Sequence, residues 1–250
     1  MFAVSPPGGT GPALMEPAGA HPLSTERKFV AAAAQADAAL ALAAHFCVPD
    51  PEHPVGAIAS VYYDTSRLAA YAEKADGDNL KKKVRVRWYA EEPASAQDRT
   101  HPAFLECKHR VGGARFKLRT SFAADYDLLD RAPLTDPFWL RLLARAAGDI
   151  ADALPLDLLP VLCIRYSRRR FVCPRTHARV AIDTDVRVDR INPDLLPGAA
   201  LPRLDVAVCE FKNRRAGEMP WAGALAAGGF RLASFSKYGQ CVARILNGGI

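Results

Sequence analysis

Polar and apolar residues alternate along several stretches of the chain, most clearly between positions 81 and 89. There the cations Lys81, Lys83, Arg85 and Arg87 interleave with Val84, Val86 and Trp88. Because successive side chains of a β-strand point to opposite faces, this pattern predicts a strand with one cationic and one apolar face. The whole set of predicted strands is Thr25–Val30, Ala57–Tyr63, Lys81–Tyr89, Ala103–Arg110, Ala114–Phe122, Leu159–Val172, Ala178–Val188 and Asp205–Lys212.

Helices are predicted between these strands. They cover Ala31–His45, Ser66–Lys74, Tyr126–Leu154 with breaks at Pro133 and Pro137, and Lys237–Leu246. Eight or so antiparallel strands with inserted helices favour an α+β fold, an antiparallel β-barrel that is closed or nearly closed, with helices packed outside.

The length of 250 residues fits one domain. Residues 1–23 are rich in Pro, Gly and Ala without periodicity, so we expect a disordered tail there and the folded domain over residues 24–250. The six cysteines are dispersed and are predicted to be reduced core residues. No apolar run reaches the length of a membrane span, which favours a cytoplasmic protein and leaves a membrane-bound partner open.

The net charge of +6 favours an anionic partner, and the placement of the charges along the chain narrows the class of that partner. Charged side chains also share one face of four further predicted strands: Glu106, Lys108 and Arg110; Arg115, Lys117 and Arg119; Arg179, Asp183, Asp185 and Arg187; Glu210 and Lys212. One interpretation is a sheet whose charged face lies in water. The other is a barrel whose charged face points inward around a bound polyanion, because unpaired ions in a dry interior each cost several kcal/mol.

Eight short motifs follow one another along the chain: Glu26-Arg27-Lys28, Tyr63-Asp64-Thr65, Lys83-x-Arg85-x-Arg87, Leu105-Glu106-Cys107-Lys108, Tyr166-x-Arg168, Arg179-x-x-x-Asp183, Glu210-Phe211-Lys212 and Ser236-Lys237-Tyr238. In this order they resemble the VTC (vacuolar transporter chaperone) domain. That domain is the polyphosphate polymerase branch of the triphosphate tunnel metalloenzymes, which are relatives of the CYTH proteins. The resemblance covers about Thr25 to Leu246.

The resemblance implies an eight-stranded tunnel barrel that transfers the γ-phosphate of ATP to a growing polyphosphate chain, with Mn²⁺ or Mg²⁺ as cofactor. It implies catalytic roles for Arg85, Arg87, Lys237 and Glu210. The metal ligand would be Glu210, with Glu106 and Glu26 as helpers or ion-pair partners. The phosphate ligands would be Lys28, Lys83, Arg85, Arg87, Lys108, Lys117, Arg168, Arg179, Lys212 and Lys237.

Some features leave alternatives open. The CYTH signature would read Ser24-Thr25-Glu26-Arg27-Lys28, so its first carboxylate is missing, which favours the VTC branch. The alternation of side chains along their strand does not show which of Arg165, Arg168, Arg169 and Arg170 point inward. A metal-dependent triphosphatase or polyphosphatase and a non-catalytic polyphosphate-binding module are the rival functions. A nucleic-acid-binding protein ranks last because no matching motif is present, and the expected partners are therefore ATP and inorganic polyphosphate.

Overall fold

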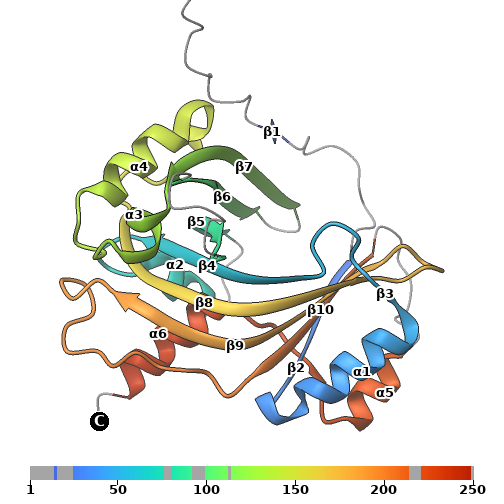
Figure 1. Ribbon diagram of the computed structural model, residues 1–250. Coiled ribbons are helices and arrows are strands. Elements are labelled where there is room, and N and C mark those ends of the chain that lie inside the picture. The colour runs from blue at the N-terminus through green and yellow to red at the C-terminus, as the bar shows by residue number, and fades with distance from the viewer. Residues whose placement is uncertain are drawn as a thin grey trace, which may run out of the picture.

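The computed structural model describes residues 14–15, 25–75, 80–91, 99–111, 114–213 and 221–248. Its centre is a strongly curved antiparallel sheet of eight long strands (Figure 1). In spatial order these are β7 (Ala114–Asp125), β6 (Thr100–Val111), β5 (Leu80–Tyr89), β4 (Val55–Asp64), β8 (Leu159–Val172), β9 (Arg179–Ile191), β10 (Ala207–Asn213) and β2 (Thr25–Ala31). Three two-residue strands complete it: β1 (Leu14–Met15) pairs with β7, β3 (Val48–Pro49) with β8, and β11 (Arg231–Leu232) with β2.

One half of the outer face of the sheet is covered by the helical segment after β7. This segment comprises α3 (Tyr126–Arg131), α4 (Phe138–Ala147) and a 3₁₀ segment (Gly148–Ala153), so the predicted breaks near the two prolines are confirmed. Asp125 caps α3 by accepting a hydrogen bond from the Leu128 amide at 3.1 Å. Trp139 of α4 packs against Trp88 of β5 within a core that also holds Val84 and Val86. The apolar face of β5 is therefore the face that packs against these helices.

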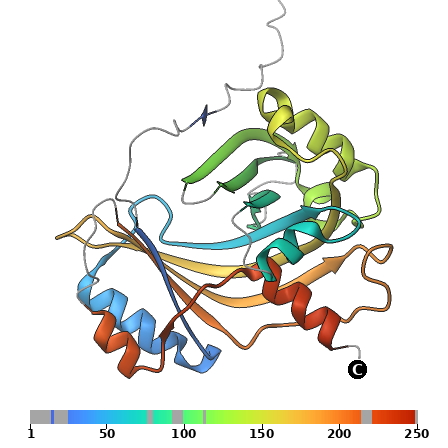
Figure 2. The same ribbon diagram turned by 180° about the vertical axis from the view of Figure 1, so that it is seen from behind.

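The other half of the outer face is covered by α1 (Ala36–Phe46) and the short α5 (Ala222–Ala227), which lie together beside β2, β9 and β10 (Figures 1 and 2). Their core includes Val180 and Ile182 of β9 and Phe211 of β10. Burial of these apolar side chains, at about 25 cal/mol per Å² of apolar surface, holds the helices on the sheet.

The last helix, α6 (Lys237–Asn247), packs against the opposite, inner face. Tyr238, Cys241 and Val242 contact a core that includes Tyr62 of β4 and Val208 of β10. Helix α2 (Ala69–Ala75) lies beside α6, as Figure 2 shows. Ser236 caps α6 by accepting from the Gly239 amide at 3.2 Å. The start of α6 is thereby directed to the charged side of the sheet.

The α+β prediction of an eight-stranded antiparallel barrel with outer helices is confirmed, with α6 as a helix on the inner side. The predicted tail falls mostly outside the described residues and stays a prediction, as do the domain bounds; Leu14–Met15 lies against β7. None of the helices in the described part of the chain has the length and apolar character needed to cross a membrane.

The expectation that Asp183, Asp185 and Arg187 share one face of their strand is wrong. In the β8–β9 ladder Asp183 lies opposite Arg168, whereas Arg187 lies opposite Arg165, and the register shifts between these pairs. Asp185 adopts a left-handed backbone with φ of 52° at this irregularity. The bulge turns Arg187 to the outer face while Asp183 keeps its inner position.

Candidate functional site

The inner face of the sheet gathers charged side chains from seven strands and from the start of α6. The described cations there are Lys28, Lys83, Arg85, Arg87, Lys108, Lys117, Arg119, Arg168, Lys212 and Lys237, and the carboxylates among them are Glu26, Glu106, Asp183 and Glu210. We call this set the inner cluster. Its cations outnumber its carboxylates by more than two to one, so it carries a large net positive charge.

Glu106 of β6 is the centre of the first part of the inner cluster. Its Oε2 accepts hydrogen bonds from Arg85 Nε at 2.8 Å and Arg85 Nη2 at 2.5 Å. Arg87, Lys117 and Arg119 each approach it within 3.8 Å. Burial alone would raise the pKa of this carboxyl group, but Arg85, Arg87 and Lys117 outweigh burial and hold the pKa well below its usual range. Glu106 therefore stays ionised and orients two of the predicted catalytic arginines.

Two buried tyrosines support these arginines from the neighbouring strands. Arg85 Nη1 donates to the Tyr62 hydroxyl at 3.1 Å, and Arg87 Nη2 donates to the Tyr166 hydroxyl at 2.9 Å. Burial favours the neutral phenol, yet Arg87, Arg168 and Lys237 together lower the pKa of Tyr166. The Tyr166 hydroxyl thus lies in a strongly positive environment.

Asp183 of β9 is the centre of the second part. Its carboxylate accepts two hydrogen bonds from Arg168, at 2.5 and 2.7 Å, and also pairs with Lys237 at the start of α6. Asp183 is fully buried, and although burial opposes ionisation, Arg168 and Lys237 lower its pKa to about 2. Lys237 Nζ also lies 4.4 Å from the centre of the Tyr166 ring. Asp183 therefore links α6 to the sheet, because it binds Lys237 of α6 and Arg168 of β8, two of the predicted phosphate ligands.

The third part lies on β2 and β10, where each carboxylate has a lysine beside it. Lys28 Nζ is 2.6 Å from Glu26, and Lys212 Nζ is 2.7 Å from Glu210. Lys28 is paired across the ladder with Glu210, and Lys212 with Glu26, so the four groups share one patch of the inner face. Burial and the charge of Glu210 both act to raise the pKa of Glu26, which indicates that the two carboxylates are close, but Lys28 and Lys212 outweigh them and lower the pKa of Glu26.

A row of three lysines crosses the sheet from β5 to β7. Lys108 is the cross-strand partner of both Lys83 and Lys117. The residue Lys108 as a whole is exposed to solvent. Desolvation of its amino group by the surrounding protein, together with the nearby charge of Arg85, nevertheless lowers its pKa to about 8. Lys83 Nζ donates to Ser236 Oγ at 2.9 Å, so the row also reaches the cap of α6. Like charges held this close favour binding of an anion.

The structure distinguishes among the arginines of β8 and β9. Arg168 lies on the inner face, whereas Arg165 lies on the outer face, where it pairs with Asp130 and Asp189. Arg170 contacts the His53 carbonyl and the Tyr89 ring. Arg179 is exposed at the start of β9, where it lies opposite Lys212 in the β9–β10 ladder and has Asp50 as a charged neighbour. The side chains of Lys81, Arg110 and Arg115 lie outside the described residues.

The sequence interpretation missed three contributors to the inner cluster. Arg119 was placed on the correct face by parity but was not chosen as a ligand, although its guanidinium lies 3.8 Å from the Phe104 ring centre. Tyr62 and Tyr166 are not among the site residues expected from the sequence, and the pairing of their hydroxyls with Arg85 and Arg87 depends on the β4–β5 and β4–β8 registers. Of these three residues, only Arg119 could have been identified from the sequence, because the alternation along its strand places it on the charged face.

The implied divalent metal can be tested against the carboxylates of the cluster. The described residues contain no group of three or more His, Cys, Asp and Glu side chains suited to hold a metal ion. Glu26 and Glu210 nevertheless fit Mg²⁺ or Mn²⁺, because these ions are commonly held by one or two carboxylates together with substrate phosphates. The surroundings of Glu106 favour its alternative role as an ion-pair partner, since four cations already approach it.

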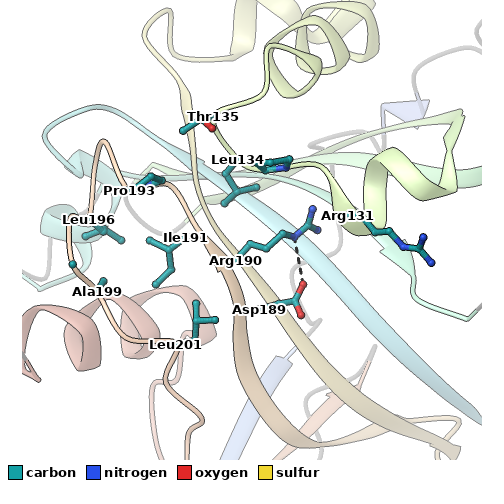
Figure 3. A pocket seen from close by; sticks show the side chains of 12 residues that line it. Arg131, Leu134, Thr135, Asp189, Arg190, Ile191, Pro193, Leu196, Ala199 and Leu201 are labelled. Carbon is teal, nitrogen blue, oxygen red and sulfur yellow. Dashed lines mark ion pairs between the residues drawn. The ribbon is translucent and has the colours of Figure 1, made fainter.

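A separate pocket of about 490 Å³ lies on the outside of the barrel, between the loop after α3 and the loop after β9 (Figure 3). Leu134, Ile191, Leu196 and Leu201 give it a mainly apolar wall. Arg190 and Asp189 pair at its edge at 3.4 Å. Arg190 donates to the carbonyls of Ala132 and Leu129 at 2.6 and 2.8 Å, so this arginine is used to hold the end of α3.

Comparison with known proteins gives a family match. The family model described as the VTC domain matches residues 24–246. Solved structures similar to the chain include a candidate adenylyl cyclase from Hippeastrum with a dominant triphosphatase activity (TM-score 0.49, 14% identity, 89% of this chain and 95% of that chain). Another is a candidate adenylate cyclase from Bacillus halodurans (TM-score 0.47, 11% identity, 86% of this chain and 94% of that chain). No curated protein matches the chain.

Proposed function

Because the chain belongs to the VTC domain family, we propose that it is a polyphosphate polymerase that uses ATP as phosphate donor. The observation that carries this proposal is the excess positive charge of the inner cluster. A folded interior does not keep so many cations together unless water or a polyanion accompanies them. A linear polyphosphate, with about one negative charge per phosphate, supplies the missing charge.

The spacing of the cations supports a chain-like anion. Alternate residues on a strand are about 6.5–7 Å apart, so Lys83, Arg85 and Arg87 can each contact a different phosphate. The guanidinium groups offer planar forks that can bind two phosphate oxygens, whereas lysines act as point charges. The sheet order β5, β4, β8, β9, β10 extends this grip across the inner face from β5 to β10.

In the proposed reaction a terminal oxygen of the polyphosphate chain attacks the γ-phosphorus of ATP. The bond from that phosphorus to the bridging oxygen breaks, ADP leaves, and the chain is one phosphate longer. Arg85 and Arg87, oriented by Glu106 and the two tyrosine hydroxyls, would stabilise the charge on the transferred group. Lys237 and Arg168, held by Asp183, would bind the adjoining phosphates.

Glu210 and Glu26 are the residues that would hold Mn²⁺ or Mg²⁺. A bound divalent ion would neutralise and polarise phosphate oxygens. Lys212 and Lys28 now balance these carboxylates, and both lysines could turn to phosphate oxygens when a cation takes their place. We also propose that ATP and inorganic polyphosphate are the partners and that the protein acts in the cytoplasm.

The test is incubation of the purified protein with ATP and Mn²⁺, with products resolved by gel electrophoresis and phosphorus NMR. We expect long polyphosphate chains from the wild type and none from the double variant Arg85→Ala/Arg87→Ala. The matched control is Arg141→Ala/Arg169→Ala, which removes the same charge from exposed positions outside the inner cluster and should leave synthesis unchanged.

Two other results would replace the proposal. Release of free phosphate without chain growth would make the protein a triphosphatase or polyphosphatase of the same fold, with water as the acceptor. Tight polyphosphate binding without either product would make it a non-catalytic binding module.

A further inference from the structure

Two cysteines from distant parts of the sequence meet on the outer face of the sheet. In the β3–β8 ladder Val48 pairs with Val172, so the next pair along the antiparallel strands is Cys47 and Cys173. Both are buried, at 5% and 3% exposure. Besides burial, the charge of Cys173 and a hydrogen bond with it raise the pKa of Cys47, and the hydrogen bond with Cys47 helps to lower the pKa of Cys173, so the two thiols are in contact range.

The backbone geometry at this pair suits a disulfide. The Cys47 amide donates to Ala43 and the Cys173 amide to Ala178, so the two cysteines do not bond each other through the backbone. Such non-hydrogen-bonded antiparallel pairs have Cα atoms about 4.5 Å apart and side chains close together. Disulfides span Cα separations of about 4.4–6.8 Å, so two cysteines that continue the register of this ladder by one position are expected to suit a disulfide.

Cys173 differs chemically from the other five cysteines. Burial raises the pKa of Cys47, Cys107, Cys209 and Cys241 to about 12 and also raises that of Cys163. At Cys173 burial acts in the same direction, but the Thr176 hydroxyl and the amides of Thr176 and Arg175 outweigh it and lower the pKa.

The donors to Cys173 come from the tight turn between β8 and β9. The His177 amide donates to the Cys173 carbonyl at 2.8 Å, and the Cys173 amide donates to Ala178 at 2.9 Å. His177 takes a left-handed backbone with φ of 53°. The turn places hydrogen-bond donors near the sulfur of Cys173, and such donors stabilise the reactive thiolate form of a cysteine.

We propose that Cys173 and Cys47 form an oxidation site, at which a small hydroperoxide such as hydrogen peroxide converts the two thiols into a disulfide. The Cys173 thiolate attacks one peroxide oxygen, the O–O bond breaks, and hydroxide leaves, giving a sulfenic acid. The Cys47 sulfur then attacks the Cys173 sulfur, the S–O bond breaks, and the departing hydroxide takes the Cys47 proton to form water. The disulfide joins α1 to the β8–β9 hairpin.

Oxidation at this pair is independent of the proposed polymerase reaction. The pair lies in the core formed with α1 and α5, on the opposite side of the sheet from the inner cluster. Cys209 belongs to the same core, and besides burial the charge of Cys47 contributes to raising its pKa, so Cys209 is the thiol that competes for Cys47. The turn around Cys173 predicts that Cys173 and not Cys209 is the partner.

The experiment treats the purified protein with one equivalent of hydrogen peroxide and maps disulfides by mass spectrometry of unreduced peptides. We expect a Cys47–Cys173 disulfide in the wild type, reversed by dithiothreitol, and a higher melting temperature for the oxidised protein. In Cys47→Ser a sulfenic-acid trap should label Cys173, whereas in Cys173→Ser it should not label Cys47. Cys241→Ser, in the separate core under α6, should form the disulfide as the wild type does.

A disulfide between Cys47 and Cys209, or oxidation of other cysteines while Cys173 stays reduced, would overturn the proposal. A failure of peroxide to oxidise the pair would do the same. The map of the wild-type chain needs no substitution, so the proposal remains testable if a serine variant does not fold.

Discussion

Arg165 and Arg168 lie three residues apart on β8, yet they belong to different parts of the molecule. Arg165 faces outward and is matched by Asp130 at 2.6 Å and Asp189 at 3.0 Å, with Arg190 completing this outer network at the end of α3. Arg168 faces inward and shares the single carboxylate of Asp183 with Lys237. The outer network has a carboxylate or carbonyl for each guanidinium, whereas the inner cluster is short of negative charge.

This difference separates two uses of arginine. In the outer network the protein itself supplies all the acceptors, so the ion pairs hold α3 against β8 and β9. In the inner cluster the carboxylates orient the cations without neutralising them, so the remaining charge is available to a ligand. Substitutions in the outer network should therefore change stability alone, and substitutions in the inner cluster should change the response to polyanions.

The largest effect is expected for Asp183→Asn. Loss of this fully buried carboxylate leaves Arg168 and Lys237 uncompensated, and breaking a buried pair costs about 3–5 kcal/mol of unfolding free energy. Urea denaturation measures this loss. Inorganic tripolyphosphate should stabilise the variant more than the wild type, because it replaces the missing negative charge.

The matched outer variant is Asp130→Asn, which also removes one carboxylate partner of an arginine. Tripolyphosphate should not compensate for this change. Equal stabilisation of both variants by tripolyphosphate would contradict the assignment of the inner cluster as the anion site.

A smaller loss of stability is expected for Arg190→Met. This change removes two hydrogen bonds to the carbonyls of Ala132 and Leu129, and the typical net value of about 1 kcal/mol for each gives a loss of about 2 kcal/mol. Calorimetry should find the tripolyphosphate affinity unchanged within about twofold, since about 0.4 kcal/mol corresponds to that factor. Arg168→Met should instead lower that affinity tenfold or more, which is about 1.4 kcal/mol or above. A similar affinity in both variants would remove the distinction between the two networks.

Between pH 7 and pH 9 the affinity for tripolyphosphate should fall by up to about tenfold. The sign follows from Lys108, whose pKa is lowered from 10.5 to about 8, so that its charge is lost as the pH rises through this range. A bound anion favours the charged form, and binding is therefore strongest below pH 8. Lys108→Arg keeps its charge throughout and should bind with little pH dependence in isothermal titrations; an unchanged pH profile in this variant would assign the effect to another group.

The smallest effect on affinity is expected for Arg179→Ala. This arginine is exposed at the start of β9, opposite Lys212 of the inner cluster, and exposed charges contribute about 0.2–1 kcal/mol. Tripolyphosphate affinity should therefore fall by less than about fivefold, well below the effect of Arg168→Met. A larger loss would mean that the start of β9 takes part in the anion site.

The strands can be predicted from the amino-acid sequence alone, because burial of one face imposes a period of two that is visible in β5, β6 and β7. The sequence also determines the cationic character of the inner face and most of its members, through the parity of Arg85 and Arg87 and the motif around Glu106. The two-residue strands β1, β3 and β11 and the short α5 were not predicted, since such short elements carry no periodicity of their own.

Which charged side chains contact one another depends on the tertiary fold. The bulges of β9 send Asp183 inward and Arg187 outward, although both lie at odd positions of one strand. Lys237 joins Asp183 only because α6 packs on the inner face, and Cys47 reaches Cys173 only because β3 pairs with β8. Alternation along a strand is a local property that the residues themselves encode, whereas register, bulges and helix placement depend on the packing of the whole sheet.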